Sequence, residues 1–343
     1  MANDSIIQFS HYESIDNLNE KSIKPFLNNG MGELEWVAME KIHGSNLSFI
    51  TNGINIHVAK RGGIIGDAEN FFNAQQLVKK YKNDILEIFV RVKNLVPKVG
   101  QIQIYGEMYG GVYPGFEQKV KPVQRGIYYR PEIDFIAFDI KVNSSDENFY
   151  LSNKEFERLF SGLKIDTVPV LARGKLADLI QLSPVFPTTI PTLFKLPEVP
   201  NNMAEGYVFK LNKRVSATDD RPIVKSKNGK FDEVTSTNIM TKLTTPNTYH
   251  REFSDAILKF CTQNRFNNVI SKHGPDSKEE SLIGLFIQDM VTDFIKEVPK
   301  DKMQEFKKNT RKIREYLAIY IKEHQLVAKW LNEYHNDVIE PRS

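Results

Sequence analysis

Five charged side chains in this sequence are of types that can do chemistry together, and each lies in a short apolar or glycine-containing segment. Lys41, in MEKIHGSN, is a candidate nucleophile, because an uncharged lysine amine can attack an electrophilic centre. Lys225 and Lys227 are two residues apart, a spacing that on a strand projects both cations from one face, where they could meet one anionic ligand. Glu107 and Glu205 interrupt apolar segments, and buried carboxylates need partners, which indicates contacts with a hard cation or with ribose.

Nucleophilic attack by Lys41 requires a neutral amine, whereas an unperturbed lysine side chain has a pKa near about 10.4. Partial burial and neighbouring cations both disfavour the charged ammonium form. Arg61, Lys225 and Lys227 could supply such cations. We therefore expect the Lys41 amine to lie close to the paired lysines and to the two glutamates.

Each of these residues also has an ordinary structural explanation when it is taken alone. An exposed lysine at a strand end, a solvated Lys-x-Lys face and a glutamate that caps a turn are all common in proteins. What favours chemistry is a set of six short segments in a fixed order: MEKIHGSN (39–46), AKRGG (59–63), YGEMYG (105–110), FIAFDI (135–140), AEGYVFK (204–210) and IVKSKN (223–228).

This ordered set resembles the covalent nucleotidyltransferase superfamily of ligases and capping enzymes. It resembles specifically the ATP-dependent RNA ligases of the RNA ligase 2 type, a family of double-strand RNA ligases and RNA-editing ligases. The Lys-x-His-Gly form of the first segment makes that distinction, because DNA ligases and capping enzymes usually carry aspartate where His43 stands. ARGKLADLIQL (172–182) and NRFNNVISKHG (264–274) resemble further segments of the family, so the resemblance covers nearly the whole chain.

The resemblance implies an enzyme that seals 3′-hydroxyl/5′-phosphate breaks in RNA, above all nicks in duplex RNA, using ATP and Mg²⁺ or Mn²⁺. Lys41 would carry AMP as a covalent intermediate and release diphosphate; the AMP would then pass to the RNA 5′ end before the 3′-hydroxyl attacks. By the same resemblance, Phe138 stacks on adenine, Glu107 lies near the ribose, and Glu205 and Glu107 hold the metal. His43 is expected to orient the nucleotide and not to act as a general base, since the amine can lose its proton to solvent.

The resemblance also supplies a set of candidate site residues. Lys60 and Arg61 precede two glycines, a combination suited to a loop whose backbone approaches phosphate. Phe71 and Phe72 could contact RNA or could equally anchor a helix in the core. The catalytic candidates are Lys41, Glu205, Lys225 and Lys227. The nucleotide-binding candidates are Glu40, Lys41, Ile42, Asn46, Arg61, Glu107, Phe138, Glu205, Lys225 and Lys227. The RNA-binding candidates are Ser45, Asn46, Lys60, Arg61, Phe71, Phe72 and Arg265, and Lys272 and Asp289 match further polar positions of the family's helical domain.

Two alternatives remain open on the sequence alone. A DNA ligase or a capping-type nucleotidyltransferase is disfavoured by His43 and by the lack of a recognisable β-barrel module after Lys227. A catalytically silent nucleic-acid-binding relative is disfavoured because a protein that only binds has no need of an amine beside two carboxylates.

The apolar patterns predict a mixed α and β domain with mainly antiparallel sheets, over residues 1–235. Alternation over residues 34–58, broken at Asn52 and Gly53, predicts a strand, a tight bend and a hairpin, which places Lys41 at a strand end. Helical spacing begins at Ala74. Five prolines between Ser183 and Asn202 predict an extended surface segment. Further strands are predicted at 101–109, 134–140, 206–210 and 223–227.

After about residue 235 the pattern changes to apolar residues three or four positions apart, which predicts an all-helical domain over residues 240–343. The polar segment 235–248 is the expected hinge. The predicted fold class is therefore α+β, an antiparallel-sheet nucleotidyltransferase domain followed by a helical C-terminal domain.

The composition limits the class of protein. With 41% hydrophobic and 26% charged residues, and no apolar run of about 18 residues, the 343-residue chain is expected to be globular, without a membrane span. Its single cysteine, Cys261, excludes internal disulfides and multi-cysteine zinc sites, and favours a reducing intracellular compartment, cytoplasmic or organellar. We expect no secretory signal and a monomer. The net charge of +3 does not by itself indicate nucleic acid, because phosphate contacts depend on where the cations lie.

Overall fold

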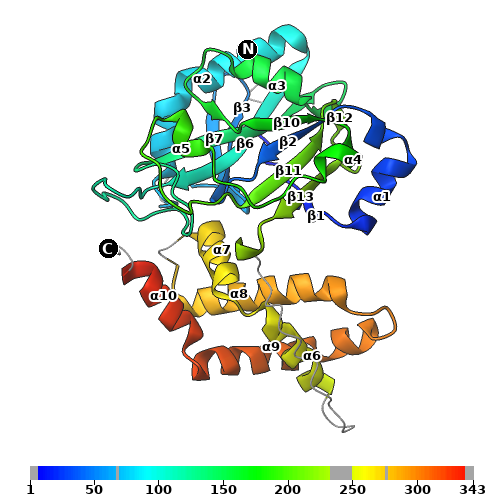
Figure 1. Ribbon diagram of the computed structural model, residues 1–343, viewed down its shortest axis with the longest axis vertical. Helices are drawn as coiled ribbons and strands as arrows, with labels where there is room; N and C mark the ends of the chain where they lie inside the picture. Colours follow the sequence, from blue (N-terminus) through cyan, green and yellow to red (C-terminus); the bar gives the residue numbers. More distant parts are fainter. Residues whose placement is uncertain (1–6, 67–68, 232–248, 275–276, 337–343) are drawn as a thin grey trace. The chain divides into compact units, whose positions relative to one another are not determined.

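A computed structural model describes residues 7–66, 69–231, 249–274 and 277–336 of the chain (Figure 1). Its internal contacts divide the chain into two compact units, Met1–Lys230 and Phe231–Ser343. The first unit combines helices with mainly antiparallel sheets, and the described part of the second is helical, which confirms the predicted α+β class. The segment 235–248, predicted to be a hinge, lies outside the described residues.

The first sheet of the first unit carries Lys41 at the end of one of its strands. Its five strands are ordered β1-β13-β11-β2-β10, and all neighbours are antiparallel except β1 and β13. Apolar side chains on one face pack against the short helices α1 and α4. These elements are β1 (Asp16–Asn17), α1 (Glu20–Asn28), β2 (Trp36–Glu40), β10 (Val170–Gly174), α4 (Leu176–Leu179), β11 (Gly206–Leu211) and β13 (Ile223–Lys227).

The second sheet carries Glu107. Its order is β12-β8-β7-β6-β3-β4-β5, and β9 pairs in parallel with β7. Between β6 and β7 the register shifts so that Tyr105 faces Asp139 and Gly106 faces Ala137, which leaves Phe138 as the extra residue of a β-bulge. The strands are β3 (Ser45–Thr51), β4 (Ile56–Lys60), β5 (Gly63–Ile64), β6 (Val99–Gly110), β7 (Ile133–Ser144), β8 (Asn148–Tyr150), β9 (Asp166–Thr167) and β12 (Val215–Ser216).

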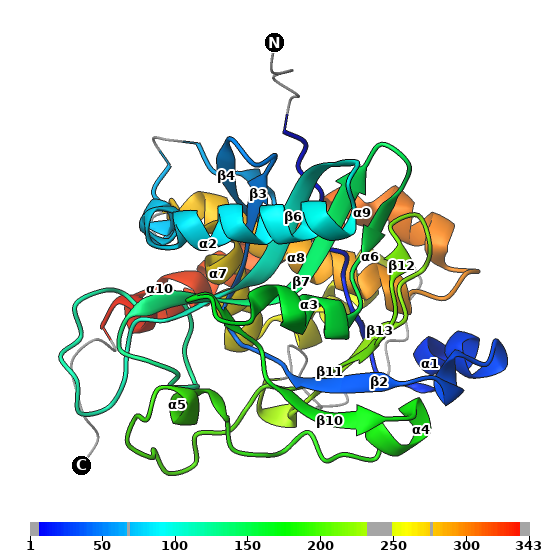
Figure 2. The ribbon, with the colours of Figure 1, turned by 90° about the horizontal axis from the view of Figure 1, so that it is seen from above.

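Two helices cover one face of the second sheet, as Figure 2 shows from above. They are α2 (Ala74–Leu95) and α3 (Asn153–Phe160). Leu77, Ile85 and Ile88 of α2 are buried at helical spacing against the sheet, which confirms the helix predicted to begin at Ala74. The core of this unit therefore lies between α2, α3 and the helix-facing side of the second sheet.

The N-terminal segment crosses the other face of the second sheet, because Gln101 and Gln103 alternate along β6 with core residues. Gln101 accepts from the Gln8 N–H (2.8 Å) and donates to the Gln8 carbonyl oxygen (2.7 Å). Gln103 makes the same pair of bonds with the main chain of Ser10, each at 3.0 Å. The chain then enters β1 of the first sheet, so this segment ties the two sheets together.

The proline-rich segment 183–202 is more folded than its sequence indicated. It contains the short helix α5 (Ile190–Leu193), and an antiparallel bridge joins Pro187 to Met203. Ile190 is 0% exposed. The prediction of an extended surface segment is therefore wrong in this part, because apolar and threonine side chains between the prolines are buried.

The second unit is built on helices that pack around one apolar core. Phe266, Phe286 and Leu317 are among its fully buried side chains. No helix in the described part of either unit is long and apolar enough to cross a membrane. The helices are α6 (Tyr249–Ile257), α7 (Gln263–His273), α8 (Glu279–Phe294), α9 (Met303–Glu323) and α10 (Leu326–Asn336).

Candidate active site

Lys41 is the first residue after β2, and its amine points toward Glu205, the residue before Gly206 at the start of β11. The Lys41 N–H donates to the carbonyl oxygen of Gly206 (2.8 Å), and its Nζ lies 2.8 Å from Oε2 of Glu205. Gly206 has a φ of +139°, and a Cβ there would lie 2.0 Å from the Ser226 carbonyl oxygen. Only glycine fits this close approach of β11 and β13.

Glu205 is the centre of the cluster. Its side chain is 3% exposed, and besides Lys41 it contacts Lys227 Nζ (3.3 Å) and His43 Nδ1 (3.4 Å). Burial alone would raise the pKa of Glu205, but the two lysine cations and the histidine together hold that pKa well below its ordinary value. Glu205 is therefore an anion at neutral pH, surrounded by hydrogen-bond donors.

Glu107 lies on β6, and its carboxyl group has a different electrostatic environment. Burial raises the pKa of Glu107 to about 8, and the charge of Glu205 adds to that effect, while Lys41 and Arg61 act in the opposite direction. The Gly44 N–H also bonds to this carboxyl group. A Cβ at Gly44 would lie 2.8 Å from the Glu107 side chain, so glycine in the Lys-x-His-Gly segment lets the loop reach β6.

The other candidates around the nucleophile lie on the same strands or on the loop between β2 and β3. Lys225 is partly buried on β13, opposite Val208 of β11. Ile42 is 5% and Ser45 is 2% exposed, whereas Asn46 is partly exposed and pairs with Glu107 across β3 and β6. The structure thus brings Lys41, His43, Glu205 and Lys227 into direct contact, with Glu107 and Arg61 within electrostatic range.

Lys60 is the last residue of β4, and Arg61 follows it. Lys60 pairs with Glu69. Arg61 is exposed; its Nη2 donates to Ser14 Oγ (2.8 Å) and its carbonyl oxygen lies 2.9 Å from His11 Nδ1. The N-terminal segment therefore contacts both the main chain and the guanidinium of Arg61, and the exposed side chain remains accessible to a ligand.

Phe71 and Phe72 lie in the hydrophobic core of the first unit. They are 1% and 8% exposed, and their rings pack edge to face. Phe71 also lies under the Lys60 ammonium, 5.5 Å from its ring centre. Of the two roles that the sequence left open for this pair, the structure places the rings where a core anchor would be.

Phe138 adjoins a second buried ionic cluster. Its ring packs against Tyr12, with centroids 5.0 Å apart. The next residue, Asp139, is 0% exposed and accepts bonds from Tyr12, Lys210 and Arg221. Burial would raise the pKa of Asp139, but the two cations lower it. This cluster, which joins β7 to β11, was not predicted.

Glu40 is a nucleotide-binding candidate whose side chain reaches into the 183–202 segment. Its carboxylate is 2% exposed. It accepts bonds from the hydroxyl of Thr188 and from both the N–H (2.9 Å) and the hydroxyl (2.7 Å) of Thr189. Burial raises the pKa of Glu40, while these bonds oppose the shift.

In the second unit Arg265 is buried. Its side chain is 1% exposed and pairs with Asp289 and Asp293, and Lys272 also contacts Asp289 (2.6 Å). The three matched polar residues do come together. However, the guanidinium expected on RNA is enclosed by carboxylates, so its first role in this structure is to hold α7 to α8.

Comparison with known proteins gives the family of the chain. Residues 34–227 match the family model for RNA ligase, and residues 247–324 match the model for the T4 RNA ligase 2 C-terminal domain. The chain belongs to the RNA ligase family. The second match places it with the RNA ligase 2 type.

Curated relatives of this RNA ligase include two mitochondrial RNA-editing ligases of Trypanosoma brucei brucei. RNA-editing ligase 2 is 28% identical over 84% of this chain and 83% of its own length. RNA-editing ligase 1 is 32% identical over 59% of this chain and 50% of its own length. Among solved structures, a Naegleria gruberi RNA ligase with ATP and Mn is 20% identical, with a TM-score of 0.42, over 65% of this chain and 57% of that one.

The donor set of this RNA ligase suits a cation that keeps much of its water. Within the described ranges, no three His, Cys, Asp or Glu side chains gather into a complete metal site. What the site offers is two carboxylates, Glu205 and Glu107, close enough for the charge of one to raise the pKa of the other. Mg²⁺ is commonly held by one or two carboxylates together with substrate phosphates and water, and this pair fits that pattern.

Proposed function

We propose that this RNA ligase is ATP-dependent and joins RNA 3′-hydroxyl and 5′-phosphate ends through a covalent Lys41–AMP intermediate. The observation that carries the proposal is the 2.8 Å contact between the Lys41 amine and Glu205. It supports the proposal because it holds the amine in a fixed position, in a cluster where Lys227 supplies a cation of the kind expected to disfavour the ammonium form and Arg61 acts on the neighbouring Glu107. A lysine with only a structural role would not require this combination of two carboxylates and further cations.

The proposed reaction consists of three transfers. Lys41 Nζ attacks the α-phosphorus of ATP; a nitrogen–phosphorus bond forms, diphosphate leaves, and the amine loses its proton to solvent. An oxygen of the RNA 5′-phosphate then attacks that phosphorus, the nitrogen–phosphorus bond breaks, and the amine takes up a proton again. Finally the 3′-hydroxyl attacks the adenylylated 5′-phosphate, a phosphodiester forms, the hydroxyl proton goes to solvent and AMP leaves.

The chain's own residues contribute mainly positions and charge, which account for most of catalysis in transfers of this kind. Glu205 orients the Lys41 amine, and Lys225 and Lys227 face the triphosphate. Bound at Glu205 and Glu107, Mg²⁺ would neutralise phosphate charge. Its presence would also favour the ionised form of Glu107, whose pKa is raised to about 8 in the structure described.

The proposed substrate is nicked duplex RNA. The family match and the RNA-editing ligases among the relatives support RNA. Arg61 and Lys60, at the end of β4, are the cations we propose for the 5′-phosphate side of the break. A comparison of nicks with ribose or deoxyribose on each side tests the substrate, and a clear preference for a deoxyribose 3′ end would favour a DNA ligase.

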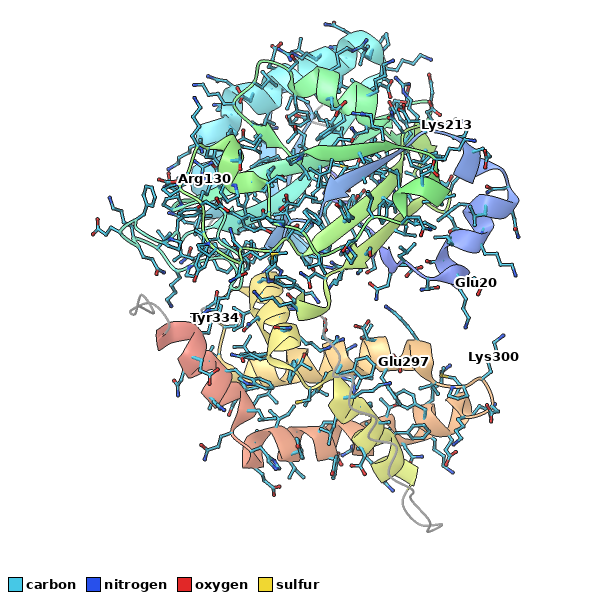
Figure 3. All side chains as sticks on the ribbon, viewed as in Figure 1. Glu20, Arg130, Lys213, Glu297, Lys300 and Tyr334 are labelled. Atoms are coloured by element: carbon cyan, nitrogen blue, oxygen red, sulfur yellow. The ribbon has the colours of Figure 1, made fainter. Side chains whose placement is uncertain are left out.

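The central test is transfer of label from α-labelled ATP to protein. Lys41→Ala should abolish the label, because the proposal assigns the covalent bond to AMP to the Lys41 amine. Lys213→Ala is the matched control, because Lys213 is an exposed lysine of the same unit, labelled in Figure 3, and should leave labelling unchanged. Retention of the label by the Lys41→Ala protein would overturn the proposal.

A further inference from the structure

The residues on both sides of Lys41 are held by side chains from distant parts of the chain. On one side the buried carboxylate of Glu40 accepts from the Thr188 hydroxyl, in the 183–202 segment. On the other side the His43 N–H donates to the hydroxyl oxygen of Tyr129 (2.9 Å), in the long connection between β6 and β7. Lys41 thus lies between two fixed points, only three residues apart in sequence.

These two supports are joined to each other by Asn202. Its carbonyl oxygen accepts from the Thr188 N–H (2.9 Å). Its side-chain amide pairs with the main chain of Tyr128, accepting from the N–H (2.9 Å) and donating to the carbonyl oxygen (2.7 Å). Tyr128 adjoins Tyr129, so the hydrogen bonds close into a loop. We call this the anchor ring: Glu40, Thr188, Asn202, Tyr128, Tyr129 and His43.

Most of the anchor ring is shielded from water. Tyr129 is 0%, Glu40 is 2%, and Thr188 and Asn202 are each 8% exposed. Hydrogen bonds in such surroundings keep their geometry, because water has little access to replace a partner and a buried polar group left unpaired is costly. The ring therefore fixes the main chain from Glu40 to His43 more tightly than the strand ending at Glu40 could.

We propose that the anchor ring presets the Lys41 amine for attack, and that Tyr129 and Asn202 are positioning residues for transfer of AMP onto Lys41. The inference rests on the proposed function, because it concerns the first step of that reaction. A displacement of about 1 Å in a reacting group can lower the rate about a hundredfold. Contacts that fix the main chain around Lys41 can therefore have a large effect on the rate of AMP transfer. Neither residue contacts the amine itself.

A general stabilising role is the competing explanation, and the chain offers a matched control for it. Tyr113 lies in the same connection as Tyr129, is also buried (2% exposed), and donates its hydroxyl to the Pro197 carbonyl oxygen in the 183–202 segment. The Arg130 guanidinium, labelled in Figure 3, lies 4.3 Å from the ring centre of Phe194 in that segment. The two segments are thus tied together outside the ring as well as through it.

The experiment compares Tyr129→Phe with Tyr113→Phe in the full chain, because each removes one hydroxyl from a buried ring of the same size. Formation of Lys41–AMP is measured in a single turnover at saturating ATP and Mg²⁺, and sealing of a preadenylylated RNA nick is measured separately. Tyr129→Phe should slow AMP transfer about ten- to a hundredfold while the KM for ATP and the sealing rate stay within about twofold. Tyr113→Phe should change neither rate.

Asn202→Ala opens the anchor ring at the side-chain amide that joins Asn202 to Tyr128 and should reproduce the pattern, so the test does not depend on one variant that folds. Equal losses in AMP transfer and in preadenylylated sealing would show a general structural role and overturn the inference. Unchanged AMP transfer in Tyr129→Phe, with normal labelling of the unmodified chain, would overturn it too and leave the proposed function standing. No labelling of the unmodified chain would reject both.

Discussion

Two buried carboxylates of the first unit are neutralised by cations, but their partners differ in how far they are closed off from solvent. The partners of Glu205 are 13–22% exposed. Those of Asp139 are nearly enclosed, with Lys210 at 7% and Arg221 at 5%. Both carboxyl groups have a lowered pKa, so both are anions at neutral pH.

The difference in exposure separates a site that can exchange partners from one that cannot. A partly exposed cation such as Lys41 can turn from Glu205 toward a phosphate without a large desolvation cost, because water already reaches it. Lys210 and Arg221 have no such route, and removing their anion would leave two charges buried. We infer that the Glu205 cluster serves chemistry, whereas the Asp139 cluster joins the two sheets.

The largest expected effect that tests this comparison is on stability. Asp139→Asn should lower the free energy of unfolding by about 3–5 kcal/mol, because it strands buried cations. Since the pKa of Asp139 is lowered from 3.8, its contribution is present above that pH and is lost as the pH falls below it. Urea unfolding at pH 7 and pH 3 measures the loss of stability and its pH dependence.

Glu87→Gln is the control. It breaks the exposed pair with Arg91 and should change the free energy of unfolding by no more than about 1 kcal/mol. Equal effects of the two variants would contradict this assignment.

The reverse pattern is expected at the other cluster. Glu205→Gln should reduce the rate of AMP transfer to Lys41 by about a hundredfold or more, because it removes the charge that orients the amine. Its melting temperature should fall less than that of Asp139→Asn, since the stranded cations are partly hydrated. Transfer of label and thermal melting of the two variants, measured side by side, decide the matter. A Glu205→Gln protein with full activity would contradict the assignment of the Glu205 cluster to chemistry and of the Asp139 cluster to structure.

A smaller effect, confined to one pH range, is expected at Glu107. Because the pKa of Glu107 is raised from 4.5 to about 8, its contribution to stability is fully present below pH 4.5 and is lost as the pH rises toward 8. Glu107→Gln removes this titration. The melting temperature of the variant relative to the unmodified chain should therefore rise from pH 5 to pH 8. A constant difference across that range would show that Glu107 has an ordinary pKa.

The smallest effect is expected where the N-terminal segment supports Arg61. Ser14→Ala removes one hydrogen bond to the guanidinium, worth about 0.5–1.5 kcal/mol, and should slow AMP transfer to the RNA 5′ end by about two- to tenfold. Ser10→Ala is the control, because the Ser10 hydroxyl on the same segment meets Lys141 (3.0 Å) and not Arg61. Single-turnover transfer from Lys41–AMP to RNA measures both variants. Equal transfer rates in the Ser14→Ala and Ser10→Ala variants would show that Ser14 does not position Arg61.

Local patterns were enough to predict the elements that present the nucleophile. The strand before Lys41, the hairpin after it and the helix from Ala74 all follow from side-chain periodicity. The strand β10 was missed, because its edge position gives it no continuous apolar run. The burial of residues 188–191 was also missed, because the prolines of this segment favour an extended surface conformation in a sequence-based prediction.

The opposite pKa shifts of the two glutamates could not have been predicted. Glu107 and Glu205 stand in similar glycine-containing sequences, yet burial raises the pKa of the first while cations lower that of the second. The difference depends on neighbours brought close by the sheets, above all Lys227 and Lys41. The buried ionic cluster around Asp139 could not be predicted for the same reason, since Arg221 is far from Asp139 in sequence.

The two glutamines that bind the N-terminal segment hold it through main-chain atoms of residues 8 and 10. Every amino acid except proline supplies the same N–H and carbonyl groups. Evolution can therefore change the side chains at Gln8 and Ser10 while the crossing persists, provided that Gln101 and Gln103 are kept. Substituting proline at either position should release the segment, whereas most other replacements should be tolerated.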